Sequence, residues 1–258
     1  MTSRQDGDAL LVDTATWAGL AGADEVDPEL ARVAAGVPGG DLALEAGRAP
    51  RAIVQVQTAT PGGVFTHEAW VGADALAVLL DLGRGDERRV LVLPPDHLAA
   101  SLARMVGLAP RAHAPADREA HPVDEAELEA WFADATAHPV DTAGLRAPGE
   151  TSPVTAQPFP GAGAEEGPVH VGQGAESHGT VSARRACAGE SVGADRAWRL
   201  VAAAVGSDDA PLMLAAVDGR DSGLWLVEAE PDLRLAPTTP TRVWRELASV
   251  LPALMTTT

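Results

Sequence analysis

The sequence predicts an α+β fold in which antiparallel strands form most of the core and amphipathic helices cover them. Three observations predict it: paired strand-like runs are separated by Gly-rich turns, proline motifs open helices directly after strands, and this arrangement occurs twice. Of the 258 residues, 46% are hydrophobic and 22% are charged, which is enough to bury a full core. We therefore expect a single domain over residues 1–258, with an N-terminal half at 1–147, a flexible Gly/Pro-rich connector at 148–180 and a C-terminal half at 181–258.

The first half is predicted to contain a helix, a four-stranded meander and a second helix. Asp27, Pro28 and Glu29 are typical of a helix start, because they combine a capping side chain, a proline at the first helical position and an acid in the first turn. Two hairpins are expected after it, with strands at Ile53–Thr58, Val64–Val71, Ala75–Leu82 and Arg88–Leu93. The helix that opens at Pro94 and ends at Gly107 would carry Leu98, Leu102, Met105 and Val106 on one face.

The second half is predicted to begin with a helix and to continue as a hairpin, a short strand and a closing helix. The expected ranges are a helix at Asp195–Val205 bearing Trp198, Val201 and Val205, strands at Leu212–Val217, Leu224–Ala229 and Leu233–Ala236, and a helix at Pro240–Met255. Between the halves, Asp124–Ala137 is predicted to be an acidic helix with Leu128, Trp131, Phe132 and Ala135 as its apolar stripe.

The two halves resemble each other in sequence pattern. Val90–Leu98 reads as a strand, a proline turn and a helix start, and Leu233–Val243 reads in the same way with two extra residues. The apolar positions of the helix that follows also match: Leu98, Leu102, Met105 and Val106 align with Val243, Leu247, Val250 and Leu251. A meander that feeds a helix through prolines, used twice, predicts two quasi-symmetric halves.

Composition excludes several classes of function. The net charge is −18, and all 19 basic residues are arginine, so binding to nucleic acid or to an anionic membrane surface is not expected. Without lysine the chain cannot form a P-loop, a pyridoxal Schiff base or a Ser-x-x-Lys site. The lone Cys187 excludes an intrachain disulfide and a four-thiolate zinc site. The absence of Lys and Asn indicates a high-GC genome, as in actinobacteria, and we expect a cytoplasmic protein.

Motifs that carry chemistry elsewhere lack their context here. Ser191 lies in a Gly-x-Ser-x-Gly run, but a polar segment precedes it and no histidine follows it, so a hydrolase triad cannot be completed in that order. His113, His121 and His138 have acidic neighbours, yet the first two lie in a proline-broken loop rather than at helical spacing. We therefore expect no enzyme: no catalytic residue, no cofactor and no metal ligand.

The C-terminal residues resemble a known family. The residues that carry the resemblance are Asp218, Ser222-Gly223, Trp225-Leu226-Val227, Leu233, Leu235-Ala236-Pro237 and Arg245-Glu246-Leu247-Ala248. They resemble the end of the EspG family, which is associated with ESX (type VII) secretion, and Val90–Leu108 looks like the middle of that family's chain. The resemblance covers roughly residues 65–108 and 195–254 and implies an EspG-like α+β fold with quasi-twofold symmetry.

The resemblance implies a cytosolic chaperone that binds helical secretion substrates and keeps them soluble, as a monomer or a homodimer. The partner is expected to be a PPE-type or WXG100-type protein; the turn at Trp70–Asp74 is short, whereas PPE-binding members of the family extend a hairpin in this region. The resemblance also implies that the partner contacts the sheet, the hairpin after the second strand and the C-terminal helix, which places Trp70, Val71, Gly72, Trp225 and Trp244 at the contact. Two other interpretations remain open: Trp225 and Trp244 complete the core, or the chain is an acidic interaction module of another class, such as an immunity-type inhibitor.

Overall fold

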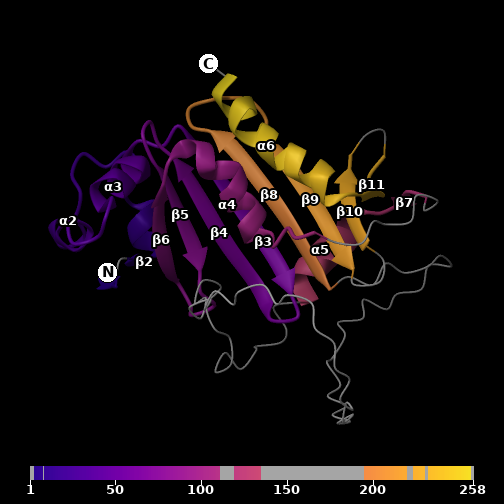
Figure 1. The fold of residues 1–258 in the computed structure, drawn as a ribbon, viewed down its shortest axis with the longest axis horizontal. Coiled ribbons are helices and arrows are strands. Elements are labelled where there is room, and N and C mark those ends of the chain that lie inside the picture. The colour runs from indigo at the N-terminus through magenta and orange to yellow at the C-terminus, as the bar shows by residue number, and fades with distance from the viewer. Residues whose placement is uncertain are drawn as a thin grey trace, which may run out of the picture.

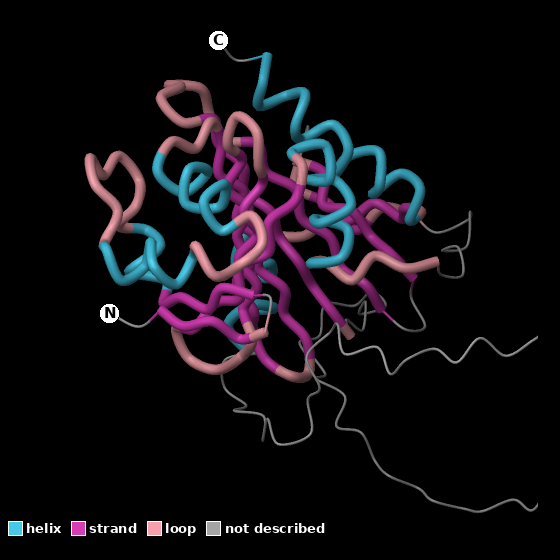
Figure 2. Tube along the Cα trace, turned by 60° about the vertical axis from the view of Figure 1, so that its left-hand side comes forward, coloured by secondary structure: helices cyan, strands magenta, loops and turns pink. Residues whose placement is uncertain are grey.

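The structure, a computed structural model, describes residues 3–7, 9–110, 119–134, 195–219, 223–229 and 232–256. In these ranges one antiparallel sheet dominates, and helices lie on both of its faces (Figures 1 and 2), so the fold is α+β as predicted. The strands are β1 (Ser3–Asp6), β2 (Ala9–Asp13), β3 (Ala52–Thr60), β4 (Gly63–Val71), β5 (Leu76–Asp81), β6 (Glu87–Leu93), β7 (His121–Pro122), β8 (Arg196–Ala204), β9 (Leu212–Gly219), β10 (Gly223–Glu228) and β11 (Arg234–Thr238). The helices are α1 (Thr14–Ala18), α2 (Pro28–Ala34), α3 (Gly40–Arg48), α4 (Leu98–Met105, after a 3-10 turn at Pro95–His97), α5 (Glu125–Asp134) and α6 (Pro240–Thr256).

The strand order of the sheet is β1-β2-β6-β5-β4-β3-β8-β9-β10-β11-β7. Reading outward from the central pair, β3, β4, β5 and β6 follow each other on one side, and β8, β9, β10 and β11 follow each other on the other. Each four-stranded meander leads into a helix, α4 or α6, and these two helices contact each other. The two units thus share a strand order, and the quasi-twofold relation between them stays a prediction that superposing residues 53–107 on 200–254 tests.

Successive side chains of each strand point to opposite faces of the sheet, so the apolar core is divided between the two faces. The front face, under α4 and α6 (Figure 1), holds the largest apolar cluster, whose strand members include Val54, Val56, Ala69, Val71, Leu76, Val78, Trp198, Leu200, Ala202, Ala216, Leu224 and Leu226. The rear face holds two smaller clusters. The first lies under α1, α2 and α3 and includes Trp17, Leu30, Leu44, Trp70, Leu79 and Val90. The second lies under α5 and contains Ala59, Val123, Phe132, Ala197, Val217, Trp225 and Leu235.

Residues 196–204 form the strand β8, so the helix predicted at Asp195–Val205 is wrong. Trp198, Leu200 and Ala202 are buried in the front cluster and alternate with residues that face the rear, which is the period of a strand. Pairing with both β3 and β9 makes β8 a central strand. Trp198, Val201 and Val205 also fit a helical spacing, and the alanine-rich context favours a helix, but the sheet partners decide the conformation.

The other predicted elements are found close to their expected bounds. Asp27 accepts hydrogen bonds from the backbone N–H groups of Glu29 and Leu30, so it caps α2 as predicted. Both hairpins of the first half and the one of the second half pair in register. The sequence analysis missed β1, β2, β7, α1 and α3, and α5 is described only to Asp134. The predicted connector at 148–180 lies outside the described residues.

A polar cluster between β4, β5 and β6 contains a histidine whose neutral form the fold favours. His67 is half-buried, and its Nδ1 accepts a hydrogen bond from the backbone N–H of Asp81 over 3.0 Å. Burial lowers the pKa of His67 below its ordinary value; the Asp81 carboxylate opposes this shift, and Arg88 adds to it. The folded protein therefore binds this proton less readily than the unfolded chain does.

We predict that His67 makes the protein less stable in mild acid. Because its folded pKa lies below its unfolded value, the stabilisation is complete above about pH 6.5 and is lost as the pH falls through the range below it. His67→Asn keeps an acceptor for the N–H of Asp81 but does not titrate, so its unfolding free energy should fall less between about pH 7 and pH 5 than that of the wild type. Urea unfolding at a series of pH values measures the difference, and parallel curves for the two proteins would contradict the prediction.

Candidate partner-binding site on helix α6

One face of α6 fixes the helix to the sheet. Val243, Leu247, Val250 and Leu254 follow each other at the spacing i, i+4, i+7 and i+11, and all four are buried in the front cluster. The first three are 0–1% exposed. Pro240 opens the helix, and Thr239 caps it by accepting a hydrogen bond from the N–H of Arg242 over 3.2 Å.

A second apolar stripe runs along α6 beside the buried one. Trp244, Ala248, Leu251 and Met255 each follow a buried residue by one position, so the second stripe is rotated by about 100° around the helix axis. Trp244 and Met255 are 41% and 43% exposed, Ala248 is exposed and Leu251 is half-buried. Aromatic and methionine side chains with this degree of exposure are typical of contact surfaces. We call these four residues the outer stripe.

An ion-pair network holds the first turn of α6, and with it Trp244, against the sheet. The carboxylate of Glu228, at the end of β10, accepts one hydrogen bond from Arg234 of β11 and one from Arg242 of α6. The N···O distance is 2.8 Å in both. The hydrogen bonds from Arg234 and then from Arg242 lower the pKa of the Glu228 carboxyl group. These groups are near the surface, so the network serves to orient the helix more than to stabilise the fold.

The structure buries the candidate residues of the β4–β5 region. Trp70 is 5% exposed; its ring packs edge-on against Trp17 at 6.2 Å, and its Nε1 donates to Glu68 over 2.8 Å. Val71 is 2% exposed and belongs to the front cluster. Gly72 is buried as well, and a Cβ at this position would lie 2.9 Å from the Cα of Ala46. These three residues are buried in the free protein and offer almost no exposed area to a partner.

Trp225 is buried on the rear face, away from Trp244. It is fully buried in the second rear cluster, 5.3 Å from the ring of His121, while its neighbours Leu224 and Leu226 face the front, as the alternation predicts. The structure therefore does not bring the five candidates together, and of the five only Trp244 offers exposed area. The sequence analysis missed Ala248 and Met255. It placed Leu251 toward the sheet, and the half-buried Leu251 does pack against the front cluster at the border between the two stripes. A one-residue shift of the buried pattern would have identified Ala248 and Met255.

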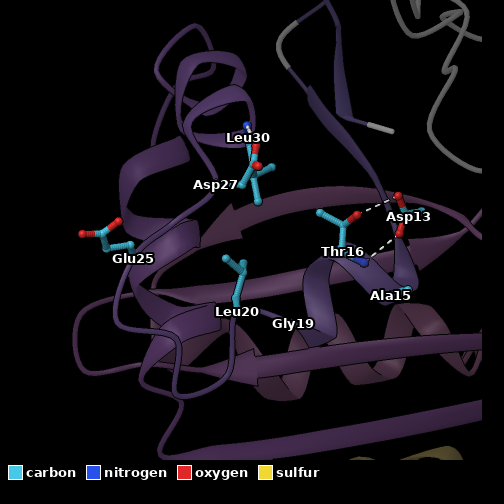
Figure 3. Close-up of a pocket in the computed structure, with 8 residues that line it drawn as sticks. All are labelled: Asp13, Ala15, Thr16, Gly19, Leu20, Glu25, Asp27 and Leu30. Carbon is cyan, nitrogen blue, oxygen red and sulfur yellow. Dashed lines mark hydrogen bonds between the residues drawn. The ribbon is translucent and has the colours of Figure 1, made fainter. Parts of the chain in front are cut away.

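The acidic residues beside a cavity in the described part of the chain have local structural contacts. A cavity of about 560 Å³ is lined by Asp13, Ala15, Thr16, Gly19, Leu20, Glu25, Asp27 and Leu30 (Figure 3). Asp13 and Asp27 are used as helix caps, and the side chain of Glu25 points away from both. Among the described residues, no three His, Cys, Asp or Glu side chains are placed to hold a metal. Ser191, Cys187, His113 and His138 lie outside those residues.

Comparisons with known proteins find similarity in structure but no match in sequence. No family model matches the chain, and no curated protein matches it. Among solved structures, the chain is similar to the Mycobacterium tuberculosis type VII secretion system chaperone EspG5, solved in complex with the PE25-PPE41 dimer. The TM-score is 0.43 and the identity is 16%, over 90% of this chain and 80% of that one. A likeness of this size does not assign the chain to a family.

In the described residues no helix is long and apolar enough to cross a membrane.

We predict effects of very different size on stability for the two stripes of α6. Leu247→Ala removes a side chain that is 1% exposed and leaves a cavity, which should cost about 2–5 kcal/mol of unfolding free energy. Trp244→Ala removes a side chain that is 41% exposed and should cost less than about 1 kcal/mol. Chemical denaturation of both variants gives these values. A loss of several kcal/mol for Trp244→Ala would place Trp244 in the core.

Proposed function

We propose that this protein is a binding protein that holds an apolar helix of a partner against the outer stripe of α6, and that it acts as a chaperone of helical type VII secretion substrates. The observation that carries the binding role is the outer stripe itself. Four buried residues already anchor α6 to the sheet. Folding therefore does not require large apolar side chains at Trp244 and Met255, and both stay exposed. An amphipathic partner helix would bury them by packing its own apolar stripe alongside.

The secretion role is supported by the sequence resemblance to the EspG family, whose motifs map onto the elements around the outer stripe. Trp225-Leu226-Val227 lies in β10, Leu235-Ala236-Pro237 lies in β11, and Arg245–Ala248 lies in α6. These are the elements that the Glu228 network ties together. A PPE-type or WXG100-type helical protein is the partner that this role requires.

A second candidate function is an acidic interaction module such as an immunity-type inhibitor, which the net charge of −18 favours. The two functions differ in their salt dependence. Association driven by the whole protein's charge weakens steeply between low and high salt, whereas packing on an apolar stripe does not. A partner whose affinity falls by orders of magnitude between about 0.05 and 0.5 M salt would favour the acidic module.

We predict that the wild-type chain, co-expressed with the helical secreted proteins encoded beside its gene, forms a complex that survives size-exclusion chromatography. Trp244→Ala should weaken this complex by about 2 kcal/mol or more, roughly a 30-fold rise in Kd, as expected for an aromatic anchor. Isothermal titration calorimetry on the purified proteins measures the change.

Arg245→Ala is the matched control, because Arg245 is an exposed neighbour on α6 that lies outside the outer stripe. It should leave the Kd within about threefold of the wild-type value. If none of the helical proteins forms a complex, the proposed function is wrong. If a complex forms and Trp244→Ala binds as tightly as Arg245→Ala, the partner uses another surface.

A further inference from the structure

Helix α5 lies on the rear of the sheet beside an apolar cluster, to which it contributes few buried side chains. The strand members of this cluster are Ala59, Ala197, Val217, Trp225 and Leu235, and each is at most 5% exposed. Within α5, burial is described for residues 125–132, and of these only Phe132 is buried; Leu128 and Trp131 are half-buried. By contrast, α6 buries four side chains along one stripe.

Few polar contacts hold α5 in place. Arg199, on the rear face of β8, pairs with Glu129 and lies 4.5 Å from the ring centre of Phe132. The same guanidinium donates to Gln57 over 2.6 Å, so the sheet orients it independently of α5. The Glu129 side chain is 58% exposed, and an ion pair this open contributes little to stability.

The helical shape of α5 is set locally. Asp124 accepts from the N–H of Glu127 over 2.7 Å, and Glu127 accepts from the N–H of Asp124 over 3.2 Å, which is a reciprocal cap. A helix of ten residues is still marginal in water and needs a surface to pack on. The segment is thus a short helix whose shape is set by its own cap and whose stability depends on the surface it packs on.

We propose that the rear surface under α5 is a second interaction surface, and that α5 occupies it in the free protein as an internal stand-in for a partner helix. The contacts of α5 define the partner: an acidic amphipathic helix with an aromatic residue over the Arg199 guanidinium, a carboxylate three residues earlier and a leucine four residues earlier. The surface lies on the face opposite to the outer stripe, so this proposal does not rest on the proposed function.

The test uses the full chain and a peptide of residues 119–134, acetylated and amidated at its ends and labelled with a fluorophore. In a released variant, Leu128→Asp with Phe132→Asp, the covalent α5 can no longer compete for the surface. This variant should bind the peptide with an apparent Kd at least about tenfold lower than the wild type, because occupancy by α5 reduces the fraction of protein that is open. Glu125→Ala, on an exposed side of α5, should bind as the wild type does, and a Phe132→Ala peptide should not bind.

Hydrogen exchange on the wild type provides a readout that needs no variant. The backbone amides of α5 should exchange at least about tenfold faster than those of α6, because α5 opens without global unfolding. Three results would overturn the proposal: equal peptide affinity for the released variant and the wild type, loss of cooperative unfolding in the released variant, or protection of α5 equal to that of α6.

Discussion

The pairing of β3 with β8 is the interaction on which the rest of the structure depends. Eight residues of each strand, 52–59 and 197–204, are in antiparallel register, and this pair joins the two meanders into one sheet. The partners are far apart in the sequence, so closing this pair costs more chain entropy than either neighbouring hairpin does. Burial on both faces offsets that cost, since Val56 and Leu200 face α4 and α6 while Ala59 and Ala197 face α5. Arg196, in the first position of β8, also links this strand to the end of α4. Its guanidinium donates hydrogen bonds to the carbonyl oxygens of Val106 and Gly107.

The outer stripe exists because α6 needs only part of its surface to complete the front cluster. Four residues spaced over three turns are enough to seat the helix, and α4 fills the adjacent part of the same face. A helix under no further constraint would carry polar residues elsewhere, as it does at Arg245 and Ser249. Trp244 and Met255 depart from that pattern. Holding them in water without a partner gives no folding benefit, and this asymmetry is the basis of the proposed binding role.

The sequence was sufficient to predict elements whose signals are local. The cap at Asp27, the turn at Pro61–Gly63 and the proline before α6 each fix a boundary through neighbouring residues alone. It was not sufficient for β8, where Trp198, Val201 and Val205 fit a helical period and only the partners β3 and β9 make it a strand. The candidate site was also hard to predict, because tertiary packing decides which of its residues are exposed. Large aromatic residues are conspicuous in a sequence, but most of them here complete the core, and Trp244 is distinguished from Trp70 and Trp225 only by what packs over it. A small residue such as Ala248 gives no signal until the helix has a known buried face.

The two proposed surfaces share strands, which constrains how independent they can be. Leu224 and Leu226 of β10 face the cluster under α6, while Trp225 between them faces the cluster under α5. A strand cannot shift toward one face without drawing its alternate side chains away from the other. The Glu228 network then ties the end of β10 to the first turn of α6, beside Trp244. Exchange of α5 for a partner helix can therefore leave α6 undisturbed only if the replacement preserves the packing of the rear cluster to which both Phe132 and Trp225 belong. That requirement is the physical reason why the rear surface would select a helix with an aromatic residue at the position of Phe132 rather than any apolar segment.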